Sequence, residues 1–190
     1  MSKLFAIEPE VGGDWGEATI ISNRAQLQSG EATIPEISYL EYLFDVWLGD
    51  CIVQGDACYI VTLAVAEAMT EAALTGADFT TVTITLSDNW LELKPHIRLP
   101  PFRRLLPRGV VHIKDGDQLI YWSGHDVCWG QRIDHVYAND ADLVDIVSLS
   151  VLPYSLVVTE QCLALLQQHQ LDHCQIEELR QGEYKQISGR

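Results

Sequence analysis

Two stretches of the chain share one pattern of apolar and polar positions. In the later stretch a short apolar run, residues 156–158, comes directly before Thr159, and leucines then recur at helical spacing at Leu163, Leu166 and Leu171. The β-branched run predicts a buried strand, the threonine hydroxyl suits a helix N-cap, and the leucine stripe predicts the buried face of a helix. Apolar residues over 174–179 indicate a strand that returns after the helix.

The earlier stretch begins with the apolar run 58–61, and Thr62 closes it. An alanine-rich segment, residues 63–74, favours a helix, and Gly76 can adopt the left-handed conformation that ends one. Residues 79–86 alternate between threonine and apolar side chains, which is typical of a strand. This stretch therefore predicts a second strand, capped helix and strand in the same order.

The two threonines that close the apolar runs are 97 residues apart. The same offset aligns three apolar pairs: Met69 with Leu166, Leu74 with Leu171, and Phe79 with Ile176. We predict an α+β fold, a single domain 1–190 with a mixed or antiparallel sheet and two strand–capped helix–strand units, around residues 58–86 and 155–179. Because only two copies occur, chance similarity is the alternative to an internal repeat.

Shorter elements are expected elsewhere in the chain. Residues 3–7 and 18–21 favour strands, whereas the glycine-rich stretch 10–17 and the polar stretch 23–35 are expected in loops. The aromatic segment 37–50 has a mixed period, which leaves strand and short helix open.

Two local signals complete the expected elements. Ser87 and Asp88 can cap a short helix over residues 89–93. Asp115 and Gly116 lie between two apolar runs, 110–113 and 118–122, and predict the turn of a β-hairpin.

The composition is that of an ordinary globular protein, with 47% hydrophobic and 21% charged residues in a chain of 190. No uninterrupted apolar run approaches the roughly 20 residues of a membrane-spanning helix, and the N-terminal apolar segment is too short for a secretory signal. The five cysteines form no Cys-x-x-Cys pair, which favours a cytoplasmic protein with buried thiols.

The net charge of −15 is distributed unevenly. Residues 1–93 contain two Lys/Arg against fifteen Asp/Glu, a net charge of −13; residues 94–114 contain six against none, +6; residues 115–190 contain four against twelve, −8. This balance argues against nucleic-acid binding as the main task and favours steering towards a basic partner.

The basic stretch 94–108 contains four prolines, and Arg103 and Arg104 follow Phe102 within it. It can be an anion or nucleic-acid site, or an irregular strap that docks on the acidic surface of the protein itself. The acidic flanks favour the strap, which would join two pseudo-repeat halves, residues 1–93 and 115–182.

A second set of residues has the chemistry of a metal-dependent or Cys/His hydrolase. Ser123, His125, Asp126 and Cys128 lie close together in the sequence, and His135 or the pair His173–Cys174 could supply further ligands. A zinc site needs four ligands brought together by the fold, and a nucleophile needs a base held by a third group. Neither a Gly-x-Ser-x-Gly turn nor an oxyanion motif is present, so a loop histidine and a core thiol are the favoured interpretation.

Trp129 and four acidic residues that follow it in the sequence are the candidates for contact with a basic partner, the tryptophan as an apolar anchor and the acids for orientation. The acids are Asp134, Asp140, Asp142 and Asp145. The alternative is a solvated loop followed by a helix N-terminus, where carboxylates are favoured locally.

Six phrases spread over most of the chain carry a family resemblance. They are AIEPEVGG (6–13) followed by Gly16 and Glu17, FDVWLGD (44–50), CYIVT (58–62), LTG (74–76), LVVTE (156–160) and LDHC (171–174). They resemble small bacterial proteins related to the immunity proteins of polymorphic toxin systems, of the Imm11-like or Myxococcus immunity-domain group. Where that group usually has Val-Val-Ser, this chain has Thr159 in the serine position. The resemblance implies toxin neutralisation in interbacterial competition, and it implies no particular contact residues.

We therefore expect a non-enzymatic cytoplasmic immunity-type protein, without cofactor or metal, that binds a basic cognate toxin and blocks it by occlusion. We expect neither a nucleic-acid nor a membrane partner. Two alternatives remain open: the hydrolase described above, and an adaptor module that oligomerises through the aromatic segment 39–47.

Overall fold

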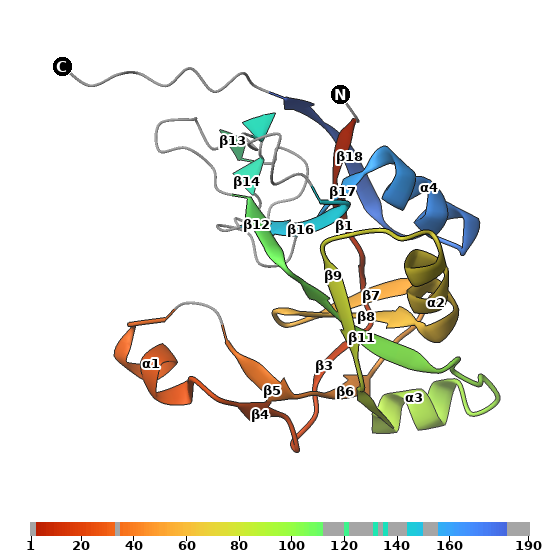
Figure 1. Ribbon diagram of the computed structural model, residues 1–190. Helices are drawn as coiled ribbons and strands as arrows, with labels where there is room; N and C mark the ends of the chain where they lie inside the picture. The colour runs from red at the N-terminus through yellow and green to blue at the C-terminus, as the bar shows by residue number, and fades with distance from the viewer. Residues whose placement is uncertain are drawn as a thin grey trace.

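Two mixed β-sheets and two helices that stack against each other make up the body of the protein, and an arm extends from it (Figure 1). The computed structural model describes residues 3–32, 35–111, 120–121, 131–132, 135–136, 144–149 and 156–181. The predicted α+β fold is confirmed, and both strand–helix–strand units are present.

The helices are α1 (Arg24–Ser29), α2 (Leu63–Glu71), α3 (Asp88–Leu93) and α4 (Glu160–Gln168). The strands are β1 (Leu4–Glu8), β2 (Glu10–Val11), β3 (Gly13–Trp15), β4 (Ile20–Ile21), β5 (Ile37–Tyr39), β6 (Glu41–Phe44), β7 (Ile52–Gly55), β8 (Cys58–Thr62), β9 (Ala77–Thr80), β10 (Thr83–Leu86), β11 (Phe102–Pro107), β12 (Gly109–Val111), β13 (Ile120–Tyr121), β14 (Gln131–Arg132), β15 (His135–Val136), β16 (Ile146–Leu149), β17 (Leu156–Thr159) and β18 (Gln175–Gln181). The sheet orders are β2-β7-β8-β11-β9, β12-β16-β17-β1-β18-β15, β10-β6-β3, β4-β5 and β13-β14.

The two units have the same topology and the same strand register. In the first, β8 and β9 flank the antiparallel strand β11, and in the second, β17 and β18 flank the antiparallel strand β1. Leu105 pairs with Tyr59 and Phe79, and Ile7 pairs with Leu156 and Ile176. The flanking residues of one unit and those of the other are 97 residues apart, which is the offset seen in the sequence.

Each large sheet takes strands from both halves of the chain, residues 3–93 and 102–181. Strand β1 lies in the sheet of the second unit, but its continuation β2 pairs with β7 in the sheet of the first. Strand β11 lies in the sheet of the first unit, and its continuation β12 pairs with β16 in the sheet of the second. The halves therefore exchange their leading strands.

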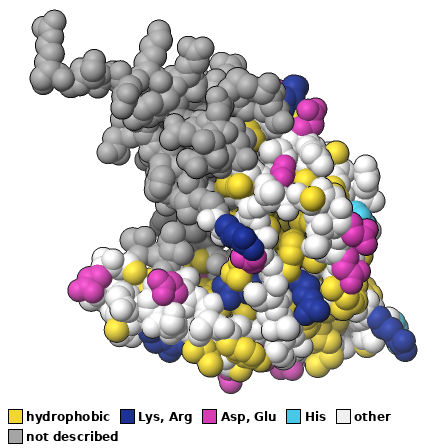
Figure 2. Space-filling model, viewed as in Figure 1, with side chains coloured by type: hydrophobic (Ala, Val, Ile, Leu, Met, Phe, Trp, Pro, Cys, Tyr) yellow, Lys and Arg dark blue, Asp and Glu magenta, His cyan; other side chains and the backbone are white. Residues whose placement is uncertain are grey.

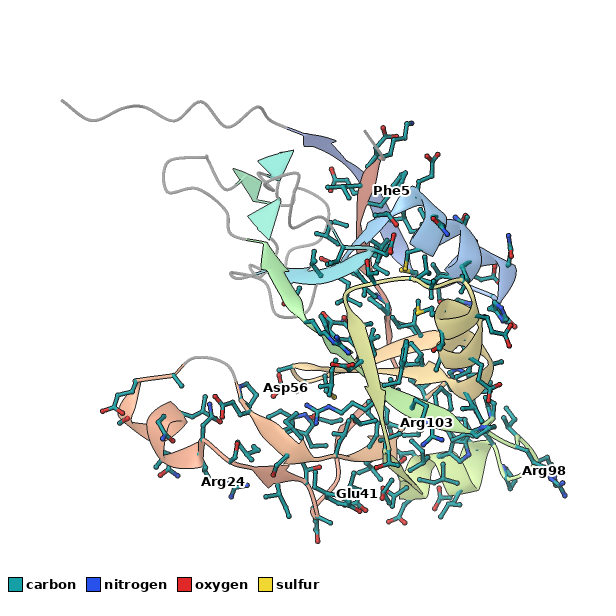
Figure 3. All side chains as sticks on the ribbon, viewed as in Figure 1. Phe5, Arg24, Glu41, Asp56, Arg98 and Arg103 are labelled. Carbon is teal, nitrogen blue, oxygen red and sulfur yellow. The ribbon has the colours of Figure 1, made fainter. Side chains whose placement is uncertain are left out.

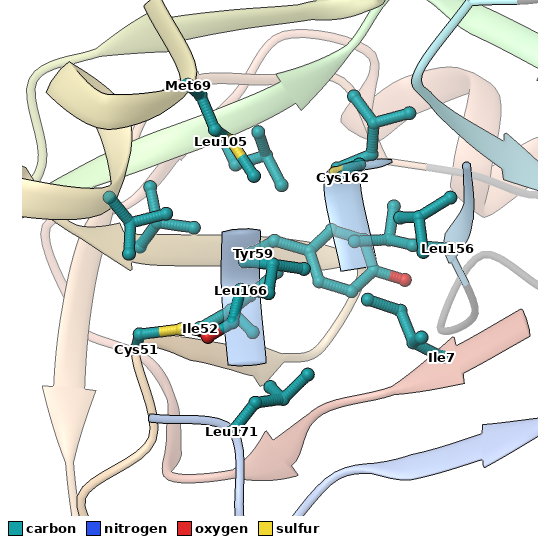
Figure 4. Close-up of a cluster of buried hydrophobic side chains, with 14 of the residues drawn as sticks. Ile7, Cys51, Ile52, Tyr59, Met69, Leu105, Leu156, Cys162, Leu166 and Leu171 are labelled. Atoms are coloured by element: carbon teal, nitrogen blue, oxygen red, sulfur yellow. Dashed lines mark hydrogen bonds between the residues drawn. The ribbon is translucent and has the colours of Figure 1, made fainter. Parts of the chain in front are cut away.

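The main core lies where the two sheets and the two stacked helices meet (Figure 4). The buried helix positions coincide at the offset of 97: Val65 with Cys162, Ala66 with Leu163, and Met69 with Leu166. Ile7 and Leu105, from the exchanged strands, lie in the same cluster. Apolar burial on this scale is the dominant favourable contribution to folding, and here it depends on both halves.

A second core supports the arm, which we define as residues 13–45. Tyr42 and Phe44 of β6 are fully buried there against Trp90 and Phe102. The aromatic segment 39–47, considered above as an oligomerisation surface, thus places these two rings inside the molecule. Oligomerisation through this segment stays an alternative hypothesis.

Several local predictions are confirmed. Thr159 caps α4 by accepting a hydrogen bond from the Cys162 amide at 3.3 Å. Ser87 caps α3 in the same way, through the Trp90 amide at 3.2 Å. Gly76 has the expected left-handed backbone, with φ +90°, but it does not end the helix: α2 stops at Glu71, and Ala73 with φ +53° is the first left-handed residue after it.

The prediction of an irregular strap over residues 94–108 is wrong for residues 102–107, which form β11 at an interior position of a sheet. Pro100 and Pro101 precede the strand and Pro107 ends it. The four residues between Phe102 and Pro107 keep their amide hydrogens, so they can pair with β8 and β9 on both sides.

Three further expectations need correction. The strand expected over 79–86 is two strands in different sheets. β9 pairs with β11, and β10, which follows it, pairs with β6. The expected loop 23–35 contains α1. The glycine-rich stretch 10–17, expected as a loop, contains β2 and β3. Glycine is needed in β3 because a Cβ on Gly13 would lie 2.0 Å from the Leu43 carbonyl oxygen of the neighbouring strand.

The predicted hairpin around Asp115 and Gly116 lies largely outside the described residues. Its described flanks pair elsewhere, since residues 109–111 pair with β16 and residues 120–121 pair with β14.

Candidate functional site

Most of the predicted contact and catalytic residues lie outside the described residues. These are Ser123, His125, Asp126, Cys128, Trp129, Asp134, Asp140 and Asp142. His135 belongs to β15, but its side chain is outside the description as well. Asp145 is therefore the one predicted contact residue whose side chain the structure describes.

The Asp145 carboxylate is used inside the molecule. One oxygen accepts hydrogen bonds from the Thr75 amide at 2.8 Å and the Thr75 hydroxyl at 2.9 Å. The other accepts from the Thr159 hydroxyl at 2.9 Å. With both oxygens accepting hydrogen bonds, Asp145 joins the start of β16 to the loop after α2. Its contact with a partner stays a prediction.

Asp50 makes the corresponding link in the opposite direction. It precedes β7, is fully buried, and accepts hydrogen bonds from the amides of Asp172 and His173, both at 2.9 Å. The His173 ring nitrogen Nδ1 lies 3.0 Å from the same carboxylate. Asp50 and Asp145 thus each hold the helix–strand loop of the other half.

The Asp50–His173 pair has the form of the acid and base in a hydrolytic triad, where a carboxylate orients a histidine. Two thiols lie nearby on the chain, but burial raises the pKa of Cys51 and of Cys174 to about 12. Such thiols are neutral at physiological pH, whereas a nucleophile must be a thiolate. The pair is therefore better suited to holding the loop than to catalysis.

Metal binding finds no support in the part of the chain that is described. There, no three His, Cys, Asp or Glu side chains are grouped so that they could hold a metal ion. The predicted alternative built on His125 and Cys128 lies outside these residues.

The arm, residues 13–45, is strongly acidic. It carries six carboxylates and one arginine, Arg24, a net charge of −5. The carboxylates are those of Asp14, Glu17, Glu31, Glu36, Glu41 and Asp45. Figure 2 shows acidic side chains along the arm, and Figure 3 labels Arg24 and Glu41 on it.

Among the described residues, no lysine or arginine forms a salt bridge with these six carboxylates. Four of them accept hydrogen bonds from neutral donors; for example, Glu41 accepts from the Ala18 amide at 2.7 Å and Asp45 from the Ser87 hydroxyl at 2.7 Å. Glu17 and Glu31 are exposed. None of the six carboxylates is thus neutralised by a salt bridge to a described residue; the Arg104 guanidinium touches the arm at the Ile37 carbonyl oxygen, to which it donates at 2.6 Å.

The end of the arm is also weakly packed. Helix α1 has no buried residue, and β4 and β5 form a ribbon of two strands. Ile20 and Tyr39 on this ribbon are 57% and 41% exposed. Such short elements gain little stability alone in water, so an arm that combines them with exposed apolar side chains suits contact with another molecule.

A groove of about 370 Å³ opens on the other side of the body, between α2 and the first sheet. We call it the α2 groove. Its lining comes from three elements: Leu63, Ala66, Glu67, Thr70 and Glu71 of α2, Phe79 of β9 and Arg103 of β11. The floor is mainly apolar and the charged groups have both signs.

No protein-family model matches the chain, and no curated protein matches it. Of the helices in the described ranges, none has the length and apolar character needed to cross a membrane. The family resemblance noted above therefore stays a prediction.

Sequence reasoning missed both surfaces for a common reason. The sequence shows an excess of acidic residues before residue 94. However, no local sequence pattern distinguishes the carboxylates on the exposed arm from buried ones such as Asp50 and Glu10. Glu10 accepts the Leu48 amide at 3.0 Å, and burial raises its pKa. Which carboxylates face solvent depends on long-range pairing.

Proposed function

We propose that this chain is a cytoplasmic immunity-type protein that binds a basic protein toxin through the acidic arm and blocks it by occlusion. The observation that carries the proposal is the charge of the arm: its own residues are six carboxylates against one arginine, and none of the carboxylates forms a salt bridge with a described residue. The family resemblance supports the same role.

A surface of this kind acts first on the rate of association. Carboxylates of one sign raise the encounter rate with a basic surface and fix its orientation. Tight binding then needs a few apolar anchors that become buried, because rim charges alone contribute little. Ile20 and Tyr39 are suited to that role, since both are exposed on the ribbon between the acids.

The proposed contact surface differs from the residues suggested by the sequence. Asp145 is engaged with Thr75 and Thr159, whereas Glu17 and Glu31 are exposed. The proposal therefore transfers the partner-binding role to the arm.

The test is binding to the protein toxin encoded next to this gene, measured by calorimetry and stopped-flow at low and high salt. We expect Glu17→Gln/Glu31→Gln to slow association by about fivefold at low salt and by much less at high salt, because the charges act through screened long-range attraction. A matched control is Glu92→Gln/Glu160→Gln, which removes two exposed charges outside the arm.

Ile20→Ser tests the anchors, and we expect it to speed dissociation while leaving the association rate nearly unchanged. Complete lack of binding by the unaltered protein would refute the proposal. Equal effects of the arm variant and its control would refute the assignment of the contact surface.

A further inference from the structure

The two units of the fold provide an internal comparison for the α2 groove. Because the strand registers match, Arg103 corresponds to Phe5: each pairs with the same position of its neighbouring strand, Val61 or Val158. The helix offset of 97 matches Glu67 with Ala164 and Glu71 with Gln168. All three charged residues of the groove thus have uncharged counterparts in the second unit.

This difference shows which residues are needed to form the unit and which are particular to the groove. Positions that face the shared core are apolar in both units, as in the pair Met69 and Leu166. The second unit builds the same topology with an aromatic ring where the first has Arg103; Figure 3 labels both Phe5 and Arg103. The charges of the groove are therefore not required to form the fold.

The three charged groups are also unpaired within the described part of the chain. Glu67 and Glu71 are exposed, Arg103 is half-buried, and no salt bridge joins any of them to a described residue. The two carboxylates are one helical turn apart on the same face of α2, where residues i and i+4 are neighbours. The guanidinium comes from the sheet, across the groove from the helix.

Groups of both signs over an apolar floor select a ligand with matching features. A guanidinium binds a carboxylate with two parallel hydrogen bonds, and two neighbouring carboxylates can accept the hydrogens of one ammonium group. A simple cation would meet Arg103 and a simple anion would meet the two glutamates. The volume of about 370 Å³ is at the small end for ligand sites and suits a molecule of amino-acid to dipeptide size.

We infer that the α2 groove binds a small zwitterion with an apolar side chain, namely an α-amino acid or a short peptide with free termini. Arg103 holds the carboxylate, Glu67 and Glu71 hold the ammonium group, and the side chain lies on Leu63 and Phe79. This inference does not depend on the acidic arm or on a toxin partner.

The test is an amide NMR titration of the full chain with leucine and with the dipeptide Leu-Leu, at millimolar concentration. We expect saturable shifts of amides along α2, at Phe79 and at Arg103. Leucinamide, which lacks the carboxylate, and N-acetyl-leucine, which lacks the ammonium group, should each bind about tenfold more weakly, since each loses a charge-assisted contact.

Variants assign the two ends of the ligand. Arg103→Gln should weaken leucine about tenfold and leave leucinamide unchanged, and Glu67→Gln/Glu71→Gln should weaken leucine and leave N-acetyl-leucine unchanged. Gln168→Ala, at the counterpart of Glu71, is the matched control and should change nothing. The amide spectrum of each variant shows at once whether it is folded.

The two probes distinguish the source of the ligand. Tighter binding of leucine indicates a free amino acid, and tighter binding of Leu-Leu indicates a peptide; either result supports the inference. Absence of saturable shifts with both probes, or equal binding of the capped analogues, overturns it.

Discussion

Asp50 illustrates how single buried residues join the halves of this molecule. Its carboxylate has no exposed surface, yet it satisfies two backbone amides and contacts the imidazole of His173. A buried carboxylate is tolerated only when such donors compensate its lost hydration. Asp145 makes the reciprocal link to Thr75. These two carboxylates therefore act within the molecule, where they hold the two halves together.

We expect Asp50→Ala to lower the free energy of unfolding by about 3 kcal/mol, because two amides and the histidine lose their acceptor in a partly buried site. Urea unfolding at pH 7 measures this. Asp172→Ala removes an exposed carboxylate from the loop that Asp50 holds and should change stability by less than about 0.5 kcal/mol. A loss of the same size in both variants would show that the loop, and not the Asp50 carboxylate, matters.

The thiols give a pH dependence whose sign follows from burial. Burial raises the pKa of Cys51, Cys58, Cys162 and Cys174 to about 12, against an ordinary value of 9.0. The folded protein thus keeps them protonated between pH 9 and 12, where the unfolded chain ionises. Their contribution to stability is complete below pH 9 and is lost as the pH rises towards 12, by about 1.4 kcal/mol per thiol at pH 10.

Urea unfolding between pH 8 and pH 10.5 tests this, with Cys51→Ala/Cys162→Ala as the comparison. The variant will be less stable at every pH, but we expect a flatter pH profile, since two of the groups that ionise on unfolding are gone. Tyr42 contributes in the same direction in both proteins, because burial raises its pKa too. Parallel profiles would contradict the assignment of the pH effect to these thiols.

At the scale of elements, the repeated unit allows equivalent residues of the two halves to be compared directly. Thr159 and Thr62 occupy the same position before α4 and α2. The Thr159 hydroxyl caps α4 and donates to Asp145, whereas the Thr62 side chain makes no cap hydrogen bond. Equivalent positions therefore carry different energetic roles.

We expect Thr159→Ala to cost about 1.5 kcal/mol more than Thr62→Ala, because the first change removes an N-cap and a buried hydrogen bond. Thermal and urea unfolding of the two variants measure the difference. Equal costs would mean that the cap contributes little and that the threonines matter mainly for their extended backbone.

The same comparison shows which elements the sequence could predict. The helices α2 and α4 and their strands were predictable because caps and apolar spacing are local signals, and their offset of 97 survives in the strand register. Strand β11 was missed because the prolines of this stretch suggested an irregular segment. Its pairing with β8 and β9 shows that Pro100 and Pro101 precede the paired residues and that Pro107 is the last of them. The α2 groove was not predictable, since residues 63–71, 79 and 103 meet only through strand pairing. The arm is one continuous segment, but which of its carboxylates face solvent depends on pairing with the rest of the fold.

At the scale of the whole molecule, the exchange of β1 and β11 makes each half depend on the other. Without β11, strands β8 and β9 of the first unit have nothing between them, and without β1 the same holds for β17 and β18. The shared core also draws on both halves. Contacts between residues so distant in sequence favour slow, cooperative folding over independent folding of the halves.

This dependence can be tested by dividing the chain between Ile97 and Arg98, which are both exposed. We expect fragments 1–97 and 98–190 to lack dispersed amide NMR spectra when alone and to recover them when mixed, because each supplies an interior strand of the other's sheet. Fragment 1–111 is the matched control, since it adds β11 and completes the second core with Phe102. If it gains dispersed signals that 1–97 lacks, the exchanged strand is the missing element; if 1–97 is folded alone, the exchange is not required for the first half.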